Sequence, residues 1–442
     1  MTLLSKKKAQ SIAKAAIKAK TVDAIAVSIT SESSGYLRFS QNQAAATGET
    51  ERLDVSVTAT SGDRSAEVTG TYVDDAGLKA LVGRAEALAK LAPKNPENMP
   101  PVGAQTYLAV DEEDATTAKM GAEERFDLTR KLLRVANKAR LDAAGMVSHR
   151  HRAVAIGNSA GLFAYHPATS VSLSMTCRTR DGTGSGWAAA IEHQIAGIDP
   201  AAVASRAAEK AELSQDPEAI EPGAYTVILE PQAVAELLQF LGWSLDRRSA
   251  DEGRSAFAKP GGGTQIGEAL FHPSIILRSD PSAPDHPSSP FAGDGQALPK
   301  TTWIDKGVLK SLSTSRYWAK KSGVAALPRP RSFILEGGSK TDEELIRGVD
   351  DGILVTRFWY NRMLQPQSIL ATGLTRDGTF QIKGGKISKS IKNLRYNESP
   401  LTMLKNVLAL GTPKRVALEG QTVVVPTMVV GGFAFSSLSD AV

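Results

Sequence analysis

Cysteine is nearly absent from this chain. Its 442 residues include a single cysteine, Cys177, so the chain cannot form an internal disulfide or a metal site built from several thiolates. Cys177 ends the alternating stretch 171–177, which predicts a strand whose thiol faces the interior or a neighbouring strand. No pairing with a histidine can be inferred from the sequence, so we assign no nucleophilic role to Cys177.

Long apolar runs and concentrated charge are absent as well. No run reaches the ~18 apolar residues that indicate a membrane-spanning helix, and no apolar run follows the lysines at 6–8 as a secretory signal requires. The net charge of +5 is small for this length, and Lys and Arg are spread along the chain, with dense spots only at 6–8 and 316–331. We therefore expect a cytoplasmic protein that contacts no membrane, and nucleic-acid binding is disfavoured.

Familiar catalytic motifs are also missing. The sequence contains no phosphate-binding Gly-x-x-x-x-Gly-Lys-Ser/Thr loop, no Gly-x-Ser-x-Gly nucleophile elbow and no His-Glu-x-x-His zinc helix. Gly182, Gly184 and Gly186 alternate in a segment that we interpret as a glycine-rich turn. No helix with a phosphate-cradling pattern follows them, so they do not indicate a dinucleotide site.

The histidines offer few metal-binding combinations. His149 and His151 are two positions apart, so on a strand they could share a face and chelate a metal. Both have arginine neighbours that oppose a cation, which favours two solvated histidines instead. His272 and His286 each precede a proline in a loop and could converge, but nothing in the sequence requires it. We assign no catalytic, cofactor-binding or metal-binding residue from these patterns.

The pattern of apolar residues predicts an α+β protein of two domains. The first, residues 1–220, is expected to be an antiparallel sheet flanked by helices, and the second, residues 221–442, to be rich in β-strands. Expected helices and strands of the first domain are helices 9–20, 75–91, 122–144 and 201–213, and strands 23–29, 53–60, 152–156, 162–165 and 170–178.

The second half begins with a strand at 225–229 and a helix at 231–245. A long connection rich in Pro, Gly, Ser and Asp follows at 257–299, and connections of this length are usually functional or mobile. Short strands come after it, which predicts a closed or half-closed sheet: 301–304, 308–313, 352–358, 380–383, 386–388 and 422–430.

Several sequence blocks recur together in one known family. The best are 293–296, 302–312, 336–346, 351–356, 372–380 and 385–387, and weaker ones are 37–42, 155–161 and 184–187. In their order and spacing these blocks resemble the TldD/PmbA family, whose members have been described as modulators of DNA gyrase and are associated with peptide maturation and proteolysis. The resemblance extends over most of the chain.

This family has two kinds of subunit. The TldD kind carries zinc on a His-Glu-x-x-x-His helix, and a downstream cysteine completes the site. Here the corresponding helix, 237–245, has no histidine and no glutamate at the motif positions, and residues 411–442 contain no cysteine. The resemblance therefore implies a PmbA/TldE-like subunit, which the serine- and arginine-containing run 246–255 also resembles, with zinc expected in a TldD-like partner and no cofactor in this chain.

The resemblance implies a non-metal-binding subunit of a cytoplasmic TldD/TldE-type metalloprotease that acts on unstructured peptides. We expect a heterodimer with a TldD-like subunit, or a homodimer, and a peptide held by strand addition. The loop 261–263 and the long connection are candidates for lining a shared cavity. Two alternatives stay open: a homomeric peptide-binding or scaffold protein without proteolytic activity, and a peptidase that uses Arg376 and Asp377.

Overall fold

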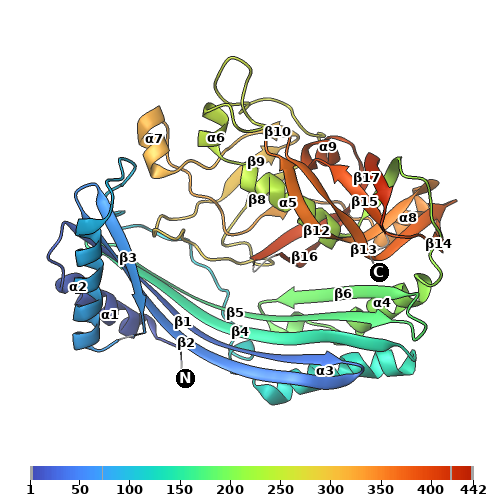
Figure 1. Ribbon diagram of the computed structural model, residues 1–442, viewed down its shortest axis with the longest axis horizontal. Coiled ribbons are helices and arrows are strands. Elements are labelled where there is room, and N and C mark those ends of the chain that lie inside the picture. The colour runs from blue at the N-terminus through green and yellow to red at the C-terminus, as the bar shows by residue number, and fades with distance from the viewer. Residues whose placement is uncertain (1–2, 72, 419–420, 440–442) are drawn as a thin grey trace.

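The protein is described here from a computed structural model that covers residues 3–71, 73–418 and 421–439. Each half of the chain builds its own sheet, and the two sheet domains lie one above the other in Figure 1. The expected α+β class is confirmed. Within the described ranges, no helix is both long and apolar enough to cross a membrane.

The N-terminal sheet is six-stranded and antiparallel, in the order β3-β2-β1-β4-β5-β6. Its long strands alternate between buried and half-exposed residues, as a sheet with one apolar face requires. The strands are β1 (Ala24–Ser40), β2 (Gln43–Ser61), β3 (Arg64–Gly70), β4 (Asp142–Asn158), β5 (Phe163–Arg178) and β6 (Ser185–Glu192).

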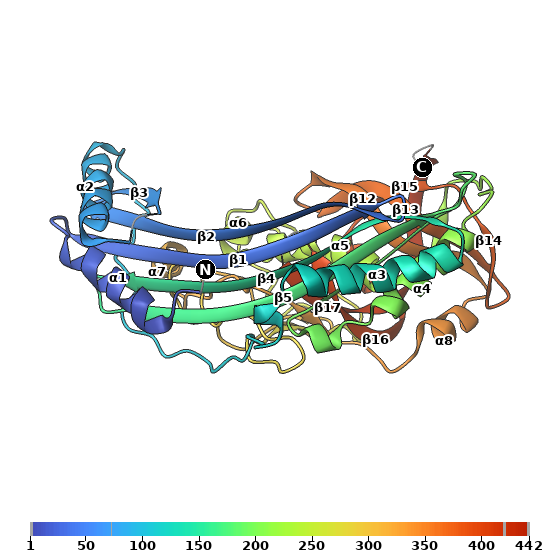
Figure 2. The same ribbon diagram turned by 90° about the horizontal axis from the view of Figure 1, so that it is seen from below.

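Four helices pack on the apolar face of this sheet, as Figure 2 shows from below. Side-chain caps mark the starts of three of them: Ser5, Asp74 and Asp199 each accept a backbone N–H from the first helical turn. The helices are α1 (Lys6–Lys18), α2 (Asp75–Leu91), α3 (Ala122–Lys138) and α4 (Pro200–Leu213). The other face of the sheet is turned toward the C-terminal domain.

The predicted helix at 122–144 is six residues too long at its C-terminal end. Helix α3 ends at Lys138, Arg140 takes a left-handed backbone conformation with φ of 57°, and β4 has already begun at Asp142. The side chain of Asn42 accepts a hydrogen bond from the Ala143 N–H at 2.7 Å. Pairing with the sheet therefore overrides the local helical pattern.

The C-terminal domain contains an eleven-stranded sheet in the order β10-β9-β8-β11-β17-β15-β13-β12-β7, with β14 beside β13 and β16 beside β17. Because β17 also pairs with β7, the strands β7, β12, β13, β15 and β17 form a closed ring, which is one of the two forms predicted, a closed or a half-closed sheet. The strands are β7 (Ala224–Leu229), β8 (Leu277–Ser279), β9 (Thr301–Asp305), β10 (Val308–Leu309), β11 (Ile334–Leu335), β12 (Asp351–Gln365), β13 (Leu370–Lys383), β14 (Lys386–Ser390), β15 (Leu394–Glu398), β16 (Val407–Leu418) and β17 (Gln421–Leu438).

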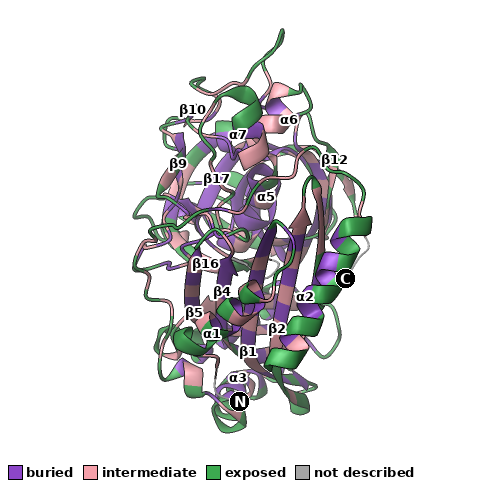
Figure 3. Cartoon of the chain, turned by 90° about the vertical axis from the view of Figure 1, so that its left-hand side faces the viewer, coloured by how far each residue is buried: buried purple, intermediate pink, exposed green. Residues whose placement is uncertain are grey.

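Helix α5 (Pro231–Ser244) lies inside this domain, where it packs against β12, β16 and β17 and is almost wholly buried (Figure 3). Its sequence is apolar nearly all round, as expected for a helix that is mostly buried. The remaining helices lie nearer the surface: α6 (Arg247–Asp251), α7 (Arg316–Ser322), α8 (Asp342–Arg347) and α9 (Pro400–Lys405).

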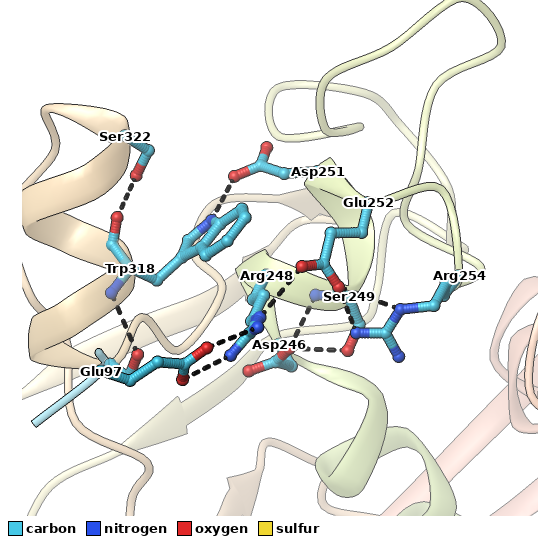
Figure 4. A network of polar contacts seen from close by, with 10 residues as sticks. Glu97, Asp246, Arg248, Ser249, Asp251, Glu252, Arg254, Trp318 and Ser322 are labelled. Carbon is cyan, nitrogen blue, oxygen red and sulfur yellow. Dashed lines mark hydrogen bonds and ion pairs between the residues drawn. The ribbon is translucent and has the colours of Figure 1, made fainter. Parts of the chain in front are cut away.

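The Pro-rich segment 92–101 of the first domain is fastened to α6 and α7. Arg248 donates two hydrogen bonds of 2.8 Å to Glu97 and one of 3.0 Å to Glu252, and its guanidinium lies 5.2 Å from the Trp318 ring (Figure 4). In this cluster each nitrogen of the Arg248 guanidinium donates to a carboxylate. The cluster therefore binds the two domains together without leaving charge for a ligand.

Candidate functional site

A β-bulge in β13 brings an acidic side chain to the boundary between the domains. Val355 pairs with Thr379 and Arg357 with Arg376, so β13 has one extra residue at this point, and Asp377 takes a φ of 54°. The strand does not end here but continues through the bulge to Lys383.

The carboxyl of Asp377 is directed at the other domain. Ser185, the first residue of β6, donates its hydroxyl hydrogen to Asp377 Oδ1 at 2.9 Å, and Asp377 is only 8% exposed. Two cavities, of about 220 Å³ and 250 Å³, meet at this carboxyl. The first is lined by Thr176, Arg178, Trp187, Arg357, Trp359, Arg376 and Asp377. The second is lined by both domains as well, including Ser185, Ser214, Gly378, Thr379 and Lys392.

Helix α5 borders a third, mostly apolar cavity of about 110 Å³. Gln239 and Trp243 of the helix line it together with Phe333 and Leu418. The Gln239 amide donates to the Glu236 carbonyl at 2.9 Å, whereas its buried Oε1 has no hydrogen-bond partner among the described residues. An orphaned acceptor of this kind marks a place where a donor from a ligand or water fits.

Glu236 points from the same helix into the domain core. The Phe358 N–H donates to its Oε2 at 2.5 Å, and the Gln232 amide donates to its Oε1 at 3.0 Å. Burial raises the pKa of Glu236 to about 7, although the Gln232 hydrogen bond and the charge of Arg357 oppose the shift. This carboxyl fixes α5 to the part of β12 that carries Arg357.

The residues present do not fit a zinc ion. Within residues 3–71, 73–418 and 421–439, no three His, Cys, Asp or Glu side chains converge as metal ligands. The one acidic residue of α5, Glu236, is already bonded to the backbone of β12. We therefore derive no catalytic step through a metal held by this chain.

His149 and His151 have separate partners rather than a shared ligand. Arg125, which is fully buried, lies with its Nη1 3.1 Å from His149 Nδ1, and burial together with this positive charge lowers the pKa of His149. His151 Nε2 lies 2.7 Å from Glu113. The expectation of two solvated histidines is wrong for His149, because helix α3 covers it with the guanidinium of Arg125.

The other sequence candidates are dispersed. His272 contacts Ser274 at 2.8 Å, whereas His286 is buried against Ser332 and burial lowers its pKa to about 4. Cys177 faces the interior as predicted, and burial raises the pKa of its thiol to about 12. A thiol held protonated in this way is inert, which agrees with the absence of a nucleophilic assignment.

The long connection lines a cavity, but its glycine loop does not. Residues 296–299 and 105–108, from the two domains, enclose about 390 Å³, and Tyr107 donates to the Gly295 carbonyl at 2.8 Å. Gly261, Gly262 and Gly263 form an exposed turn with positive φ angles and border none of the cavities described here. Whether a partner subunit shares the cavity at 296–299 stays a prediction.

A buried ion cluster at the domain junction was not foreseen from the sequence. Lys210 of α4 donates to Glu230 Oε2 at 2.7 Å, and Arg206 lies 3.2 Å from both Glu230 and Asp342. The only sequence signal was a lysine on the apolar side of helix 201–213. The partners come from elements far away in the chain, and only the folded arrangement reveals them.

Comparisons with known proteins agree in one family. A family model described as the PmbA/TldA metallopeptidase C-terminal domain matches residues 222–437, and one described as the PmbA/TldA metallopeptidase central domain matches residues 116–215. A curated metalloprotease from Methanothermobacter thermautotrophicus is 24% identical over 166 residues, which cover 35% of this chain and 36% of that protein. The chain thus spans about a third of that relative's length.

Solved structures share the whole fold. TldE from Thermococcus kodakarensis superposes with a TM-score of 0.87 at 14% identity and covers 97% of this chain and 100% of its own. A protein described as a modulator of DNA gyrase from Thermotoga maritima gives 0.84 at 18% identity, covering 98% and 100%. Its counterpart from Bacteroides thetaiotaomicron gives 0.83 at 19%, covering 98% and 99%. At these identities the likeness establishes the fold alone.

Proposed function

Because the chain belongs to the PmbA/TldD family of metallopeptidase-like proteins, we propose that it is a subunit without its own metal in an assembly that cleaves unstructured peptides. The catalytic zinc belongs to a TldD-like partner, and the assembly works in the cytoplasm. This chain contributes peptide contacts rather than hydrolytic chemistry. What supports the proposal is family membership together with the chemistry of α5.

The single observation that carries the proposal is the set of side chains on α5. Where the resemblance expects the zinc helix, residues 237–245 of this chain contain no histidine and no glutamate, and the accessible side of the helix opens on the apolar cavity beside Trp243. None of these side chains is a zinc ligand or a general base at neutral pH. An apolar cavity with one unsatisfied amide oxygen suits a peptide side chain and one donor instead.

Strand addition would supply sequence-tolerant affinity for the peptide backbone. β6 is an end strand of the six-stranded sheet, and it begins at Ser185 beside the two cavities that meet at Asp377. An extended peptide that pairs with such an edge gains main-chain hydrogen bonds whatever its sequence. This property suits a protein whose substrates are unfolded.

The test is to mix the purified chain with a TldD-like protein from the same source and an unstructured fluorogenic peptide. We expect the two proteins to copurify and to cleave the peptide together, whereas this chain alone is inactive. Cleavage by the isolated chain would contradict the proposal and direct attention to Arg376 and Asp377. Peptide binding by a stable homomer that never associates with the TldD-like protein would support the peptide-binding or scaffold alternative.

A further inference from the structure

Three arginines crowd around the 220 Å³ cavity at the domain boundary. Arg178 comes from β5, and Arg357 and Arg376 face each other across β12 and β13. Like charges directly opposite on neighbouring strands destabilise a sheet. Asp377 is the one carboxylate that lines this cavity, so the lining carries an excess of about two positive charges. The repulsion among these arginines is best explained by an anionic ligand that neutralises it.

The guanidinium groups of this cavity have not used their hydrogen-bond donors. Arg357 Nε and Arg376 Nε lie 3.6 Å and 3.8 Å from Asp377 Oδ2, which is close enough for charge attraction but too long for hydrogen bonds. Within the described part of the chain, none of the three arginine side chains donates a hydrogen bond, and Arg357 Nε is buried. This contrasts with Arg248, which donates three hydrogen bonds to Glu97 and Glu252 (Figure 4).

Two tryptophans hold the arginines in place. The Arg357 guanidinium lies 4.6 Å from the Trp187 ring centroid, and the Arg376 guanidinium lies 4.0 Å from that of Trp359. Stacking on an indole face orients the guanidinium plane and leaves the N–H groups at its edge available. Since the arginines already cover these ring faces, the tryptophans are poorly placed to stack on nucleic-acid bases.

A second acidic group near this cavity does not cancel the excess. Glu236 lies behind Arg357 and senses its charge, but burial raises the pKa of Glu236 to about 7, so it is partly protonated at neutral pH. The cavity, of about 220 Å³, is too small for a folded partner but has room for a small group such as a carboxylate. Two guanidinium edges that converge on such a volume match the bidentate geometry of carboxylate recognition.

We propose that Arg357, Arg376 and Arg178 form a carboxylate-binding subsite that anchors a peptide by its C-terminal carboxylate or by an acidic side chain. This inference deepens the proposed peptide function and rests on it. The bound carboxylate accepts hydrogen bonds from the stacked guanidinium groups, while the rest of the peptide extends past Ser185 along the second cavity. Asp377 is a positioning residue: its carboxylate attracts both Arg357 and Arg376 and so orients their guanidinium groups toward the cavity.

Binding to the isolated chain tests the subsite separately from cleavage. The probes are fluorescent Gly/Ser octapeptides with a free C-terminal carboxylate, with a C-terminal amide, and with an amide plus one internal glutamate, measured by anisotropy at low salt. We expect R357Q and R376Q to weaken binding of the carboxylate peptides about tenfold or more each, the loss typical of one charged hydrogen bond. R376K keeps the positive charge but not the planar set of guanidinium donors, so it should weaken binding less than R376Q does.

R362Q is the matched control, because Arg362 also lies on β12 and stacks on Tyr360 at 4.9 Å but lines none of the cavities described here. It should leave affinity unchanged. Thermal unfolding should show that R357Q and R376Q remain cooperatively folded at the temperature of the binding assay, so that their loss of affinity is not a loss of structure.

The three peptides separate the two sources of carboxylate. Preference for the free acid over the amide identifies the C-terminus, and binding of the amide that contains glutamate identifies an acidic side chain. Equal binding of all three peptides would overturn the subsite and leave general peptide binding intact. So would affinities that R357Q and R376Q leave unchanged. Arginine-dependent binding of a short single-stranded oligonucleotide, without binding of the carboxylate peptides, would also overturn it. Cleavage by the assembled pair, measured apart, decides the proposed function.

Discussion

Glu236 lies inside the C-terminal domain with its carboxyl against the backbone of β12. At the scale of single residues, this group shows how burial can oppose ionisation even where hydrogen bonds favour it. The folded pKa of about 7 is above the ordinary value of 4.5, so the folded chain binds this proton more tightly than the unfolded chain. The contribution of Glu236 to stability is therefore full below pH 4.5 and is lost as the pH rises through about 7.

Replacing Glu236 with glutamine should flatten the dependence of stability on pH between 4.5 and 7. Glutamine keeps a carbonyl acceptor for the Phe358 N–H and carries no charge to desolvate. We expect the difference in free energy of unfolding between E236Q and the parent to be on the order of 2–3 kcal/mol more favourable to E236Q at pH 8 than at pH 5. Urea unfolding at the two pH values measures this, and a parallel pH profile for both proteins would contradict the assignment.

Cys177 provides a second test at this scale. Because burial raises the pKa of its thiol to about 12, the thiolate that reacts with disulfide reagents is scarce in the folded protein at pH 8. We expect a colorimetric thiol reagent to label the native chain only at the rate of unfolding and to label one thiol promptly in denaturant. Immediate labelling of the native chain would show that Cys177 is exposed.

At the scale of elements, the bulge in β13 is the feature that shapes the candidate site. Gly378 has a φ of 122°, and an added Cβ would lie 2.7 Å from Thr356 Oγ1. Backbone freedom and close approach therefore both require glycine here. The bulge determines where Asp377 and Arg376 point.

G378A should destabilise the chain by about 2–3 kcal/mol, because it combines an unfavourable backbone angle with a clash. G384A is the matched control: Gly384 follows the same strand with a φ of 56°, but an added Cβ meets no atom within 4 Å. Its cost should be about 1 kcal/mol, from the backbone angle alone. Equal losses in thermal or urea unfolding would mean that the contact with Thr356 is not significant.

The sequence predicted regular helices and strands well, but it predicted poorly the positions where contacts between distant segments decide the structure. Helices with clear caps, such as α2 and α4, agree closely with the apolar periodicity, and so does β7 before α5. Gly184 and Gly186 were interpreted as part of a turn, but Gly184 directly precedes β6 and Gly186 is its second residue. Both lack side chains because the α4 backbone approaches them: an added Cβ would lie 2.2 Å from the Ala211 carbonyl at Gly184 and 2.3 Å from the Ala207 carbonyl at Gly186. Local patterns cannot reveal such long-range contacts.

Site chemistry was still harder to predict than secondary structure. Arg376 and Asp377 were noticed as a charged pair in the sequence, but Arg357, Trp187 and Arg178 were not connected with them. These residues meet because β5, β6, β12 and β13 come together at the domain boundary. Nothing in the spacing along the chain encodes that meeting.

At the scale of the whole molecule, buried charges join the two domains. Lys210 of the first domain and Glu230 of the second are both less than 10% exposed and lie 2.7 Å apart. Removing one member leaves the other charge buried without its partner, which is far more costly than the pair itself is favourable. The junction thus depends on both members being present.

E230Q should therefore destabilise the protein by about 3–5 kcal/mol, and the double variant K210M/E230Q by less than the sum of the single variants. The exposed pair Lys383–Asp351, 2.6 Å apart with both side chains more than half exposed, is the control. K383M should cost no more than about 1 kcal/mol. A double-mutant cycle by urea unfolding measures the coupling, and additive losses at Lys210 and Glu230 would contradict it.

The assignment of a metal-free subunit depends most directly on the metal content of the purified chain. Elemental mass spectrometry should be applied to the chain alone and to the chain coexpressed with a TldD-like partner from the same source. We expect no zinc in the isolated chain and about one zinc per heterodimer, with peptide cleavage only by the heterodimer. Stoichiometric zinc in the isolated chain would contradict it and would make His149, His151, His272 and His286 the first ligands to test.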